Sequence, residues 1–194
     1  GEPQVALALA AFGGGSMAAA LILPRLLDRI PDRPAMITGA VILAAGTLLG
    51  PLPGSLPALM ALWLFIGFGY SLTQTPTGRL LRRSAQAEDR PAVFAAQFAL
   101  SHACWLLAYP LAGRFGAAYG LDATFLLMAA LAAFGVVAAT RLWPANEPGE
   151  LPHAHPDLPP GHPHLTEHGE QDHSHAIVID DLHRHWPTAS PGLR

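Results

Sequence analysis

Five long apolar segments fill the first three quarters of this 194-residue chain. They cover residues 5–23, 35–52, 56–72, 92–111 and 123–140. Each segment approaches or reaches the ~20 residues that a helix needs to cross ~30 Å of hydrocarbon. Because a bilayer offers no water to backbone polar groups, such segments must satisfy their own hydrogen bonds as helices. The sequence therefore predicts an all-α, polytopic membrane helix bundle with five transmembrane helices.

Composition separates a membrane part, residues 1–145, from a tail, residues 146–194. The first part carries nine arginines and six acids, whereas the tail carries two arginines, eight acids and nine of the ten histidines. The tail is also rich in proline, and a segment this polar cannot bury enough apolar surface to form a core. We expect it to be largely disordered.

The arginines are distributed unevenly over the connections between the apolar segments. Eight of the nine in residues 1–145 lie after the first, third or fifth segment, and only Arg114 lies in another connection. Connections rich in arginine stay on the cytoplasmic side of a membrane. The sequence thus predicts an integral protein of a bacterial inner membrane, with a cytoplasmic tail and outward turns at residues 51–57 and 114–122.

The first arginine-rich connection, residues 24–33, reads PRLLDRIPDR. It resembles the cytoplasmic loop signature of the major facilitator superfamily, G-x-x-x-D-R-x-G-R-R. Asp28 and Arg29 match the Asp-Arg pair and Arg33 the final arginine, whereas prolines occupy both glycine positions and Asp32 replaces the penultimate arginine. The five segments, over residues 4–143, resemble helices eight to twelve of that family.

The resemblance implies a fragment of a secondary transporter, whose N-terminal half is missing and which moves a small solute by alternating access, coupled to protons. It also implies that Asp28, Arg29 and Arg33 form a cytoplasmic latch whose ion pairs exist in only one conformation. The alternative is that these charges only set the topology and contact water and lipid headgroups.

The fourth segment carries a polar stripe. At about 100° per residue, Gln97, Ser101, His102 and Trp105 fall with Tyr109 within roughly 140° of one another. An ionisable side chain near mid-membrane usually faces a cavity or a partner, so we expect these residues to bind substrate. Tyr70 and Gln74, near the end of the third segment, are further candidates. The alternative is a neutral histidine bonded to a neighbouring helix, with aromatic side chains that only fill the bundle.

Nine histidines follow in the tail. They are His153, His155, His162, His164, His168, His173, His175, His183 and His185. Imidazole is a good ligand for divalent Zn, Ni, Co and Cu ions, and histidine-rich tracts are a compositional pointer to metal binding. We expect loose binding at several positions in place of one fixed site. A polar tail without a metal role and a pH-responsive segment are the two alternatives.

Two rival functions stay open. One is divalent-metal efflux (Ni, Co or Zn), with the tail as ion collector; the other is a non-transporting membrane sensor of metal or pH. The sequence shows no phosphate-binding loop, no Ser/His/Asp arrangement and no paired carboxylates within the apolar segments, so we expect no enzyme. The expected partners are the lipid bilayer, the N-terminal half of the transporter and a small solute, without nucleic acid. No cofactor is expected beyond a divalent metal on the tail.

Overall fold

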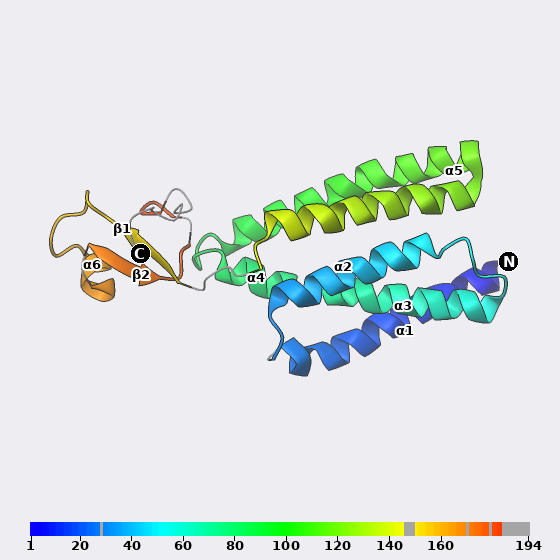
Figure 1. Ribbon diagram of the computed structural model, residues 1–194, viewed down its shortest axis with the longest axis horizontal. Helices are drawn as coiled ribbons and strands as arrows, with labels where there is room; N and C mark the ends of the chain where they lie inside the picture. The colour runs from blue at the N-terminus through cyan, green and yellow to red at the C-terminus, as the bar shows by residue number, and fades with distance from the viewer. Residues whose placement is uncertain (28, 146–149, 170, 179, 184–194) are drawn as a thin grey trace.

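The computed structural model describes residues 1–27, 29–145, 150–169, 171–178 and 180–183. Its elements, in chain order, are α1 (Glu2–Leu27), α2 (Asp32–Leu48), α3 (Leu56–Gln74), α4 (Thr77–Arg83), α5 (Arg90–Leu142), β1 (Leu151–Ala154), α6 (Pro163–His168) and β2 (Asp172–His175). The first five form an elongated helix bundle, and the last three form a small module beyond one end of it (Figure 1). The prediction of a membrane helix bundle is confirmed.

Among the described residues, three helical stretches are long and apolar enough to cross a membrane: Glu2–Arg25, Leu56–Arg83 and Arg90–Leu142. The third has 53 residues and is broken at Gly120, whose φ of 83° lies in the left-handed region. Glycine adopts this conformation without a Cβ penalty, so α5 turns back on itself there as two antiparallel arms (Figure 1). We call residues 90–119 the first arm and residues 121–142 the second arm. The outward turn expected at 114–122 is thus helical except at Gly120.

Prolines and a cap set the ends of α3. Ser55 is the N-cap, and its Oγ accepts a bond from the Ala58 amide at 3.5 Å. Pro76 separates α3 from α4 because proline lacks the amide hydrogen that would continue the ladder. The Thr77 hydroxyl donates to the Thr73 carbonyl across this break, at 3.1 Å.

The bundle is held together by close contacts at small residues. α3 packs against both α1 and α2, and α2 packs in turn against α5. A Cβ on Gly15 of α1 would lie 1.9 Å from the Leu64 oxygen of α3, and one on Gly67 would lie 2.0 Å from the Phe12 oxygen. Beside them, the Ser71 hydroxyl donates to the Ser16 carbonyl at 2.9 Å. Small side chains let membrane helices approach this closely.

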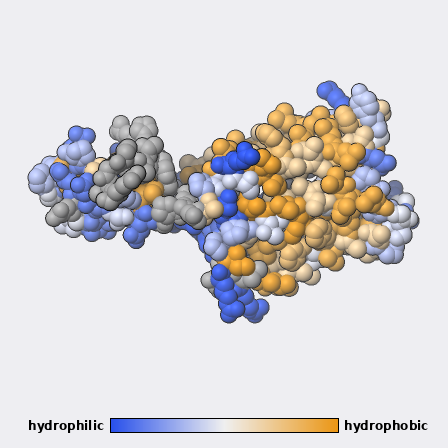
Figure 2. All heavy atoms as spheres, in the orientation of Figure 1, coloured by the Kyte–Doolittle hydropathy of each residue, from blue (hydrophilic) through white to orange (hydrophobic). Residues whose placement is uncertain are grey.

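The ends of the bundle differ in charge. The N-terminus, the α2–α3 connection and the Gly120 bend lie at one end (Figure 1). The α1–α2 connection, α4 and the end of α5 lie at the other, next to the tail module, so the arginine-rich connections share one end. Apolar surface covers the length of the bundle, and hydrophilic surface covers the module (Figure 2). The cytoplasmic orientation of the arginine-rich end stays a prediction.

The described part of the tail differs from the expected disorder, because it contains regular structure. β1 and β2 pair antiparallel, with Leu151 opposite His175 and His153 opposite His173. α6 begins after His162, whose ring Nδ1 accepts a bond from the His164 amide at 3.3 Å. Composition did not reveal this module because few of its side chains are apolar; buried Leu165 and Ile177 form its small core.

Candidate functional site

Three groups of side chains could carry function: the polar stripe of α5, the charged end of the bundle and the histidines of the tail module. The stripe lies on the first arm. Gln97 Nε2 donates to Ser101 Oγ at 2.9 Å, and that hydroxyl donates to the Gln97 carbonyl at 2.8 Å. His102 Nδ1 lies 2.8 Å from the Phe98 carbonyl. A carbonyl only accepts, so Nδ1 is the donor, and in the neutral ring Nε2 then carries the lone pair.

Aromatic rings continue the stripe along the helix. The ring of Trp105 lies 4.8 Å from that of His102 and is stacked on that of Tyr109 at 6.2 Å. The Trp105 side chain is 48% exposed and Tyr109 is 69% exposed. These rings therefore offer open faces for stacking, and the hydrogen bonds and ring contacts of the stripe described above stay within the first arm.

Tyr70 and Gln74 lie elsewhere in the described bundle. Both are exposed, and the Tyr70 ring lies 5.5 Å from that of Phe12 on α1. Their helix packs on α1 and α2, whereas α2 packs on α5. The structure therefore does not bring Tyr70 and Gln74 into one pocket with the α5 stripe.

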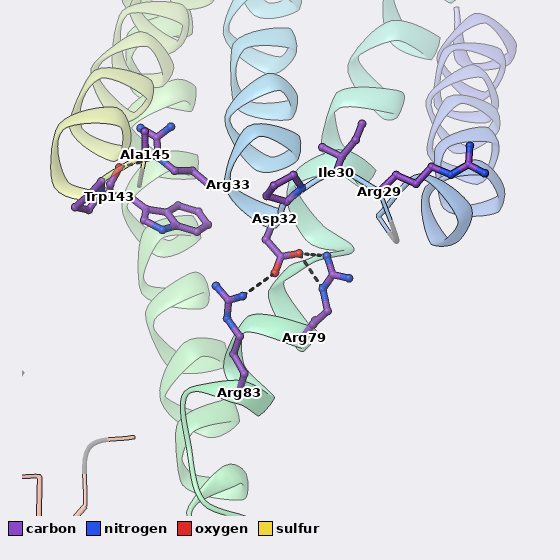
Figure 3. Close-up of a pocket in the computed structure, with 10 residues that line it drawn as sticks. Arg29, Ile30, Asp32, Arg33, Arg79, Arg83, Trp143 and Ala145 are labelled. Atoms are coloured by element: carbon purple, nitrogen blue, oxygen red, sulfur yellow. Dashed lines mark hydrogen bonds and ion pairs between the residues drawn. The ribbon is translucent and has the colours of Figure 1, made fainter. Parts of the chain in front are cut away.

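The charged end centres on Asp32, which is only 5% exposed at the start of α2 (Figure 3). Arg79 of α4 donates to its carboxylate through Nε at 2.9 Å and also through Nη2. Arg83 Nη1 lies 3.4 Å from the second carboxylate oxygen. Arg33 donates to the Trp143 carbonyl at 2.7 Å, at the C-terminus of α5, where bare carbonyls favour a cation. These residues line a pocket of about 500 Å³.

The residues expected to form the latch do not form the ion pairs around Asp32. Asp28 lies outside the described residues. Arg29 lines the pocket without an ion pair among the described side chains, and Arg33 bonds to backbone carbonyls of α5 in place of an acid. Among the described side chains of the bundle, the acid that pairs with another element is Asp32, which stands where the family signature has its penultimate arginine. The signal in the sequence was an acid at the penultimate arginine position of the signature, next to Arg33 and just before an apolar segment.

The histidine cluster is built by strand geometry. Side chains alternate between the two faces of a strand, so the two histidines of β2, His173 and His175, lie on one face. His153 of β1 is directly opposite His173 in the register. His155 follows β1 directly, and its amide donates to the Gln171 carbonyl at 3.1 Å. α6 then adds His164 and His168, one helical turn apart, with ring centroids separated by 4.9 Å.

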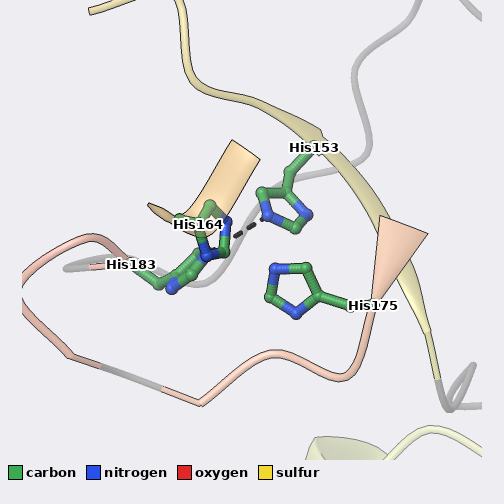
Figure 4. Close-up of side chains that lie close together, drawn as sticks. All are labelled: His153, His164, His175 and His183. Carbon is green, nitrogen blue, oxygen red and sulfur yellow. Dashed lines mark hydrogen bonds between the residues drawn. The ribbon is translucent and has the colours of Figure 1, made fainter. Parts of the chain in front are cut away.

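A fourth segment completes the cluster with His183, which is 7% exposed. Its Nε2 lies 3.1 Å from His153 Nε2 and 3.1 Å from His155 Nε2. One ring nitrogen from each of His153, His164, His175 and His183 lies within 4.8 Å of the others (Figure 4). A second group, His153, His155, His164 and His173, meets the same limit and shares two members with the first.

Burial and crowding lower the pKa of four of these histidines, which favours their neutral form. Desolvation, followed by repulsion from neighbouring imidazoles, lowers the pKa of His164 to about 4. Desolvation also lowers the pKa of His153, His155 and His175 from the ordinary histidine value. Neutral imidazole is the form that binds metal. His162 belongs to neither group, and His185 lies outside the described residues.

The profile of the Major Facilitator Superfamily matches residues 1–177 of this chain. The chain therefore belongs to this family of membrane transporters, whose members in general are not enzymes. The match confirms the resemblance read from residues 4–143 and continues beyond them into the tail.

The chain is also similar to proteins whose functions are curated. The chain is 30% identical over 158 residues to the Multidrug efflux pump Tap of Mycobacterium bovis (strain BCG / Pasteur 1173P2) and to that of Mycobacterium tuberculosis (strain ATCC 25618 / H37Rv). The aligned region covers 81% of this chain and 38% of each relative. The chain thus spans 38% of the length of the curated relatives that it matches.

Proposed function

We propose that this chain is the C-terminal part of a secondary transporter that exports a small organic solute by alternating access, coupled to protons. An N-terminal half would complete it, with the solute bound between the halves near the middle of the membrane. The name of the similar proteins, multidrug efflux pump, supports export and an organic solute.

The observation that carries this proposal is the uncovered polar stripe on α5. Gln97 and Ser101 are only half-buried, and His102 and Trp105 are exposed although they lie in a helix that crosses the membrane. Polar side chains at this depth are costly against lipid, so they favour a partner helix or a water-filled path. The stripe therefore fits a surface that faces the other half of a transporter.

Each side chain of the stripe has a distinct proposed role. Trp105 stacks on a planar or cationic solute, an interaction worth about 0.5–2 kcal/mol. Gln97 and Ser101 bond to its polar groups. His102 takes up and releases the coupling proton, because imidazole changes charge near neutral pH.

A transport assay tests these roles. Proteoliposomes would contain the complete transporter, with ethidium, a planar aromatic cation, as substrate and an imposed pH gradient. We expect Trp105→Ala to raise the half-saturating ethidium concentration about fivefold, the equivalent of ~1 kcal/mol of lost stacking. His102→Gln should remove the stimulation by the pH gradient. Leu106→Ala, at a 74% exposed position outside the stripe, is the control and should leave both quantities unchanged. Wild-type kinetics in both stripe variants would contradict the proposal.

The histidine cluster favours the second candidate, divalent-metal efflux. Away from the ends of the described membrane helices and from the Gly120 bend, however, the histidine, cysteine and acidic side chains that could bind such an ion are His102 and Cys104, which both lie exposed on one arm of α5. The same proteoliposomes distinguish the two candidates: Zn²⁺ or Ni²⁺ movement without ethidium movement would favour metal efflux. If neither ethidium nor metal moves across the membrane while the module still binds metal, the result would favour a membrane sensor.

A further inference from the structure

The tail module brings unpaired nitrogen lone pairs together. His153 Nδ1 lies 2.9 Å from the Leu151 carbonyl, and His175 Nδ1 lies 2.8 Å from the Ala176 carbonyl. Since these oxygens only accept, each Nδ1 is the donor and each neutral ring has its lone pair on Nε2. The Nε2 of His175 is buried and has no hydrogen-bond partner among the described residues.

His183 is oriented in the same way by a carboxylate. Its Nδ1 lies 2.9 Å from Asp180 Oδ1, and that oxygen also accepts the amides of Leu182 and His183. The lone pair of His183 is therefore also on Nε2. With the Nε2 atoms of His153 and His183 3.1 Å apart, two lone pairs face each other with no hydrogen between them. A cation between the rings removes this conflict.

The distances between the ring nitrogens fit a single metal ion. Zinc bound by histidine has Zn–N distances of ~2.0–2.1 Å in a tetrahedron, which separates the ligand nitrogens by about 3.3 Å. The observed Nε2 separation of 3.1 Å between His153 and His183 is close to this value, and one ring nitrogen from each of His164 and His175 lies within 4.8 Å of both. Metal-bound histidines also donate their other ring N–H to a carbonyl or carboxylate, as His153, His175 and His183 do.

The described part of the module has a very small apolar core. The module spans residues 150–183, and its buried apolar side chains among the described residues are Leu165 and Ile177. Domains below ~40 residues usually need disulfides, a metal or a partner to stay folded. The sole cysteine of the chain, Cys104, is in α5, so a disulfide within the module is excluded.

We propose that residues 150–183 form a folded site for one divalent transition-metal ion, of which Zn²⁺ fits best, held by the Nε2 atoms of His153, His164, His175 and His183. His155 and His173 surround the same centre, and Asp180 positions His183. Imidazole ligands select Zn²⁺, Ni²⁺ or Cu²⁺ over Mg²⁺ or Ca²⁺. The site needs no transport activity and goes beyond the proposed export function.

Calorimetry on the whole chain tests the site. The 194-residue protein, purified in detergent and freed of metal with a chelator, would be titrated with Zn²⁺ and separately with Mg²⁺. We expect one Zn²⁺ per chain, no Mg²⁺ binding, and at least a hundredfold loss of Zn²⁺ affinity in His153→Ala and in His183→Ala. His162→Asn is the control, because asparagine keeps the cap of α6 while one imidazole is lost. Unchanged affinity in both alanine variants, or an equal loss in His162→Asn, would overturn the proposal.

Two further measurements separate ligands from residues that only support the fold. X-ray absorption at the zinc edge should count four imidazole nitrogens in the wild type and in His162→Asn, and three in His183→Ala loaded with excess Zn²⁺. Asp180→Asn keeps an oxygen for the two backbone amides, and should weaken Zn²⁺ binding about 10–100-fold without changing the imidazole count. A shell of oxygen ligands, or four imidazoles in His183→Ala, would overturn the assignment.

Discussion

At the scale of single residues, Asp32 is a buried acid whose ion pairs join two helices of the bundle. It lies in the first turn of α2, where the helix dipole favours a carboxylate, and is bonded to Arg79 and Arg83 of α4. The neighbouring Arg33 bonds to the last carbonyls of α5. Two adjacent residues thus connect α2 to α4 and to α5 at the arginine-rich end.

Asp32→Asn should destabilise this end of the bundle. Hydrogen bonds to charged groups contribute about 1.5–3 kcal/mol, but Arg79 and Arg83 are 41% and 57% exposed, so water replaces part of the loss. We expect a decrease of about 1–2 kcal/mol in the free energy of unfolding, measured by thermal unfolding in detergent. Glu88→Gln, at an exposed acid before α5, is the control. Equal midpoints in the two variants would show that the ion pairs do not stabilise the fold.

At the scale of helices, the α1–α3 contact is set by glycines. Gly15 and Gly67 face backbone atoms of the opposing helix, whereas a Cβ on Gly14 would meet no atom within 4 Å. Apolar side chains from three helices, including Ala19, Leu23 and Leu72, form the core next to this contact.

The effect of an alanine substitution on stability should differ among these glycines according to their position. Gly15→Ala and Gly67→Ala place a methyl group against a backbone carbonyl, so we expect each to cost about 1–3 kcal/mol of stability. Gly14→Ala should be neutral or stabilising by up to ~1 kcal/mol, because alanine is the better helix former. Unfolding midpoints of the three variants in one detergent check this, and three similar shifts would contradict the described packing.

Some of these features could be predicted from the sequence, and others depend on contacts between distant residues. The apolar lengths predicted the helices, and the run of three glycines at residues 13–15 is of the kind that lets membrane helices pack closely. The pairing of Asp32 with Arg79, 47 residues apart, depends on how α2 packs against α4. The histidine cluster likewise needs the register that places Leu151 opposite His175. The His-x-His spacing does match the alternation of side chains along a strand. The sequence alone could therefore have predicted that such a pair lies on one strand face.

At the scale of the whole molecule, the chain combines a membrane bundle with a module outside it. The bundle has a broad apolar exterior, and the module has a small apolar core with many imidazoles (Figure 2). The two parts should therefore be stabilised by different forces: lipid and helix packing in the bundle, and a bound metal in the module.

Metal removal should unfold only the module. Because the binding free energy of a structural metal is also folding free energy, chelation should expose the backbone amides of residues 150–183 to exchange. Hydrogen exchange measured by mass spectrometry should show this loss of protection, while α1 and α3 keep theirs. Adding Zn²⁺ back should restore protection. A module equally protected with and without chelator would mean that it folds without metal.

The most direct measurement of the proposed transport function is the water accessibility of α5 in the complete transporter. Single cysteines at Gln97, Ser101, Leu100 and Leu107, in a Cys104→Ala background, would be reacted with a membrane-impermeant maleimide. If the polar stripe lines the solute path, positions 97 and 101 should react much faster than 100 and 107, and ethidium should protect them. Equal reaction rates around the helix, or faster reaction at the leucine positions without protection, would contradict a solute path along this face.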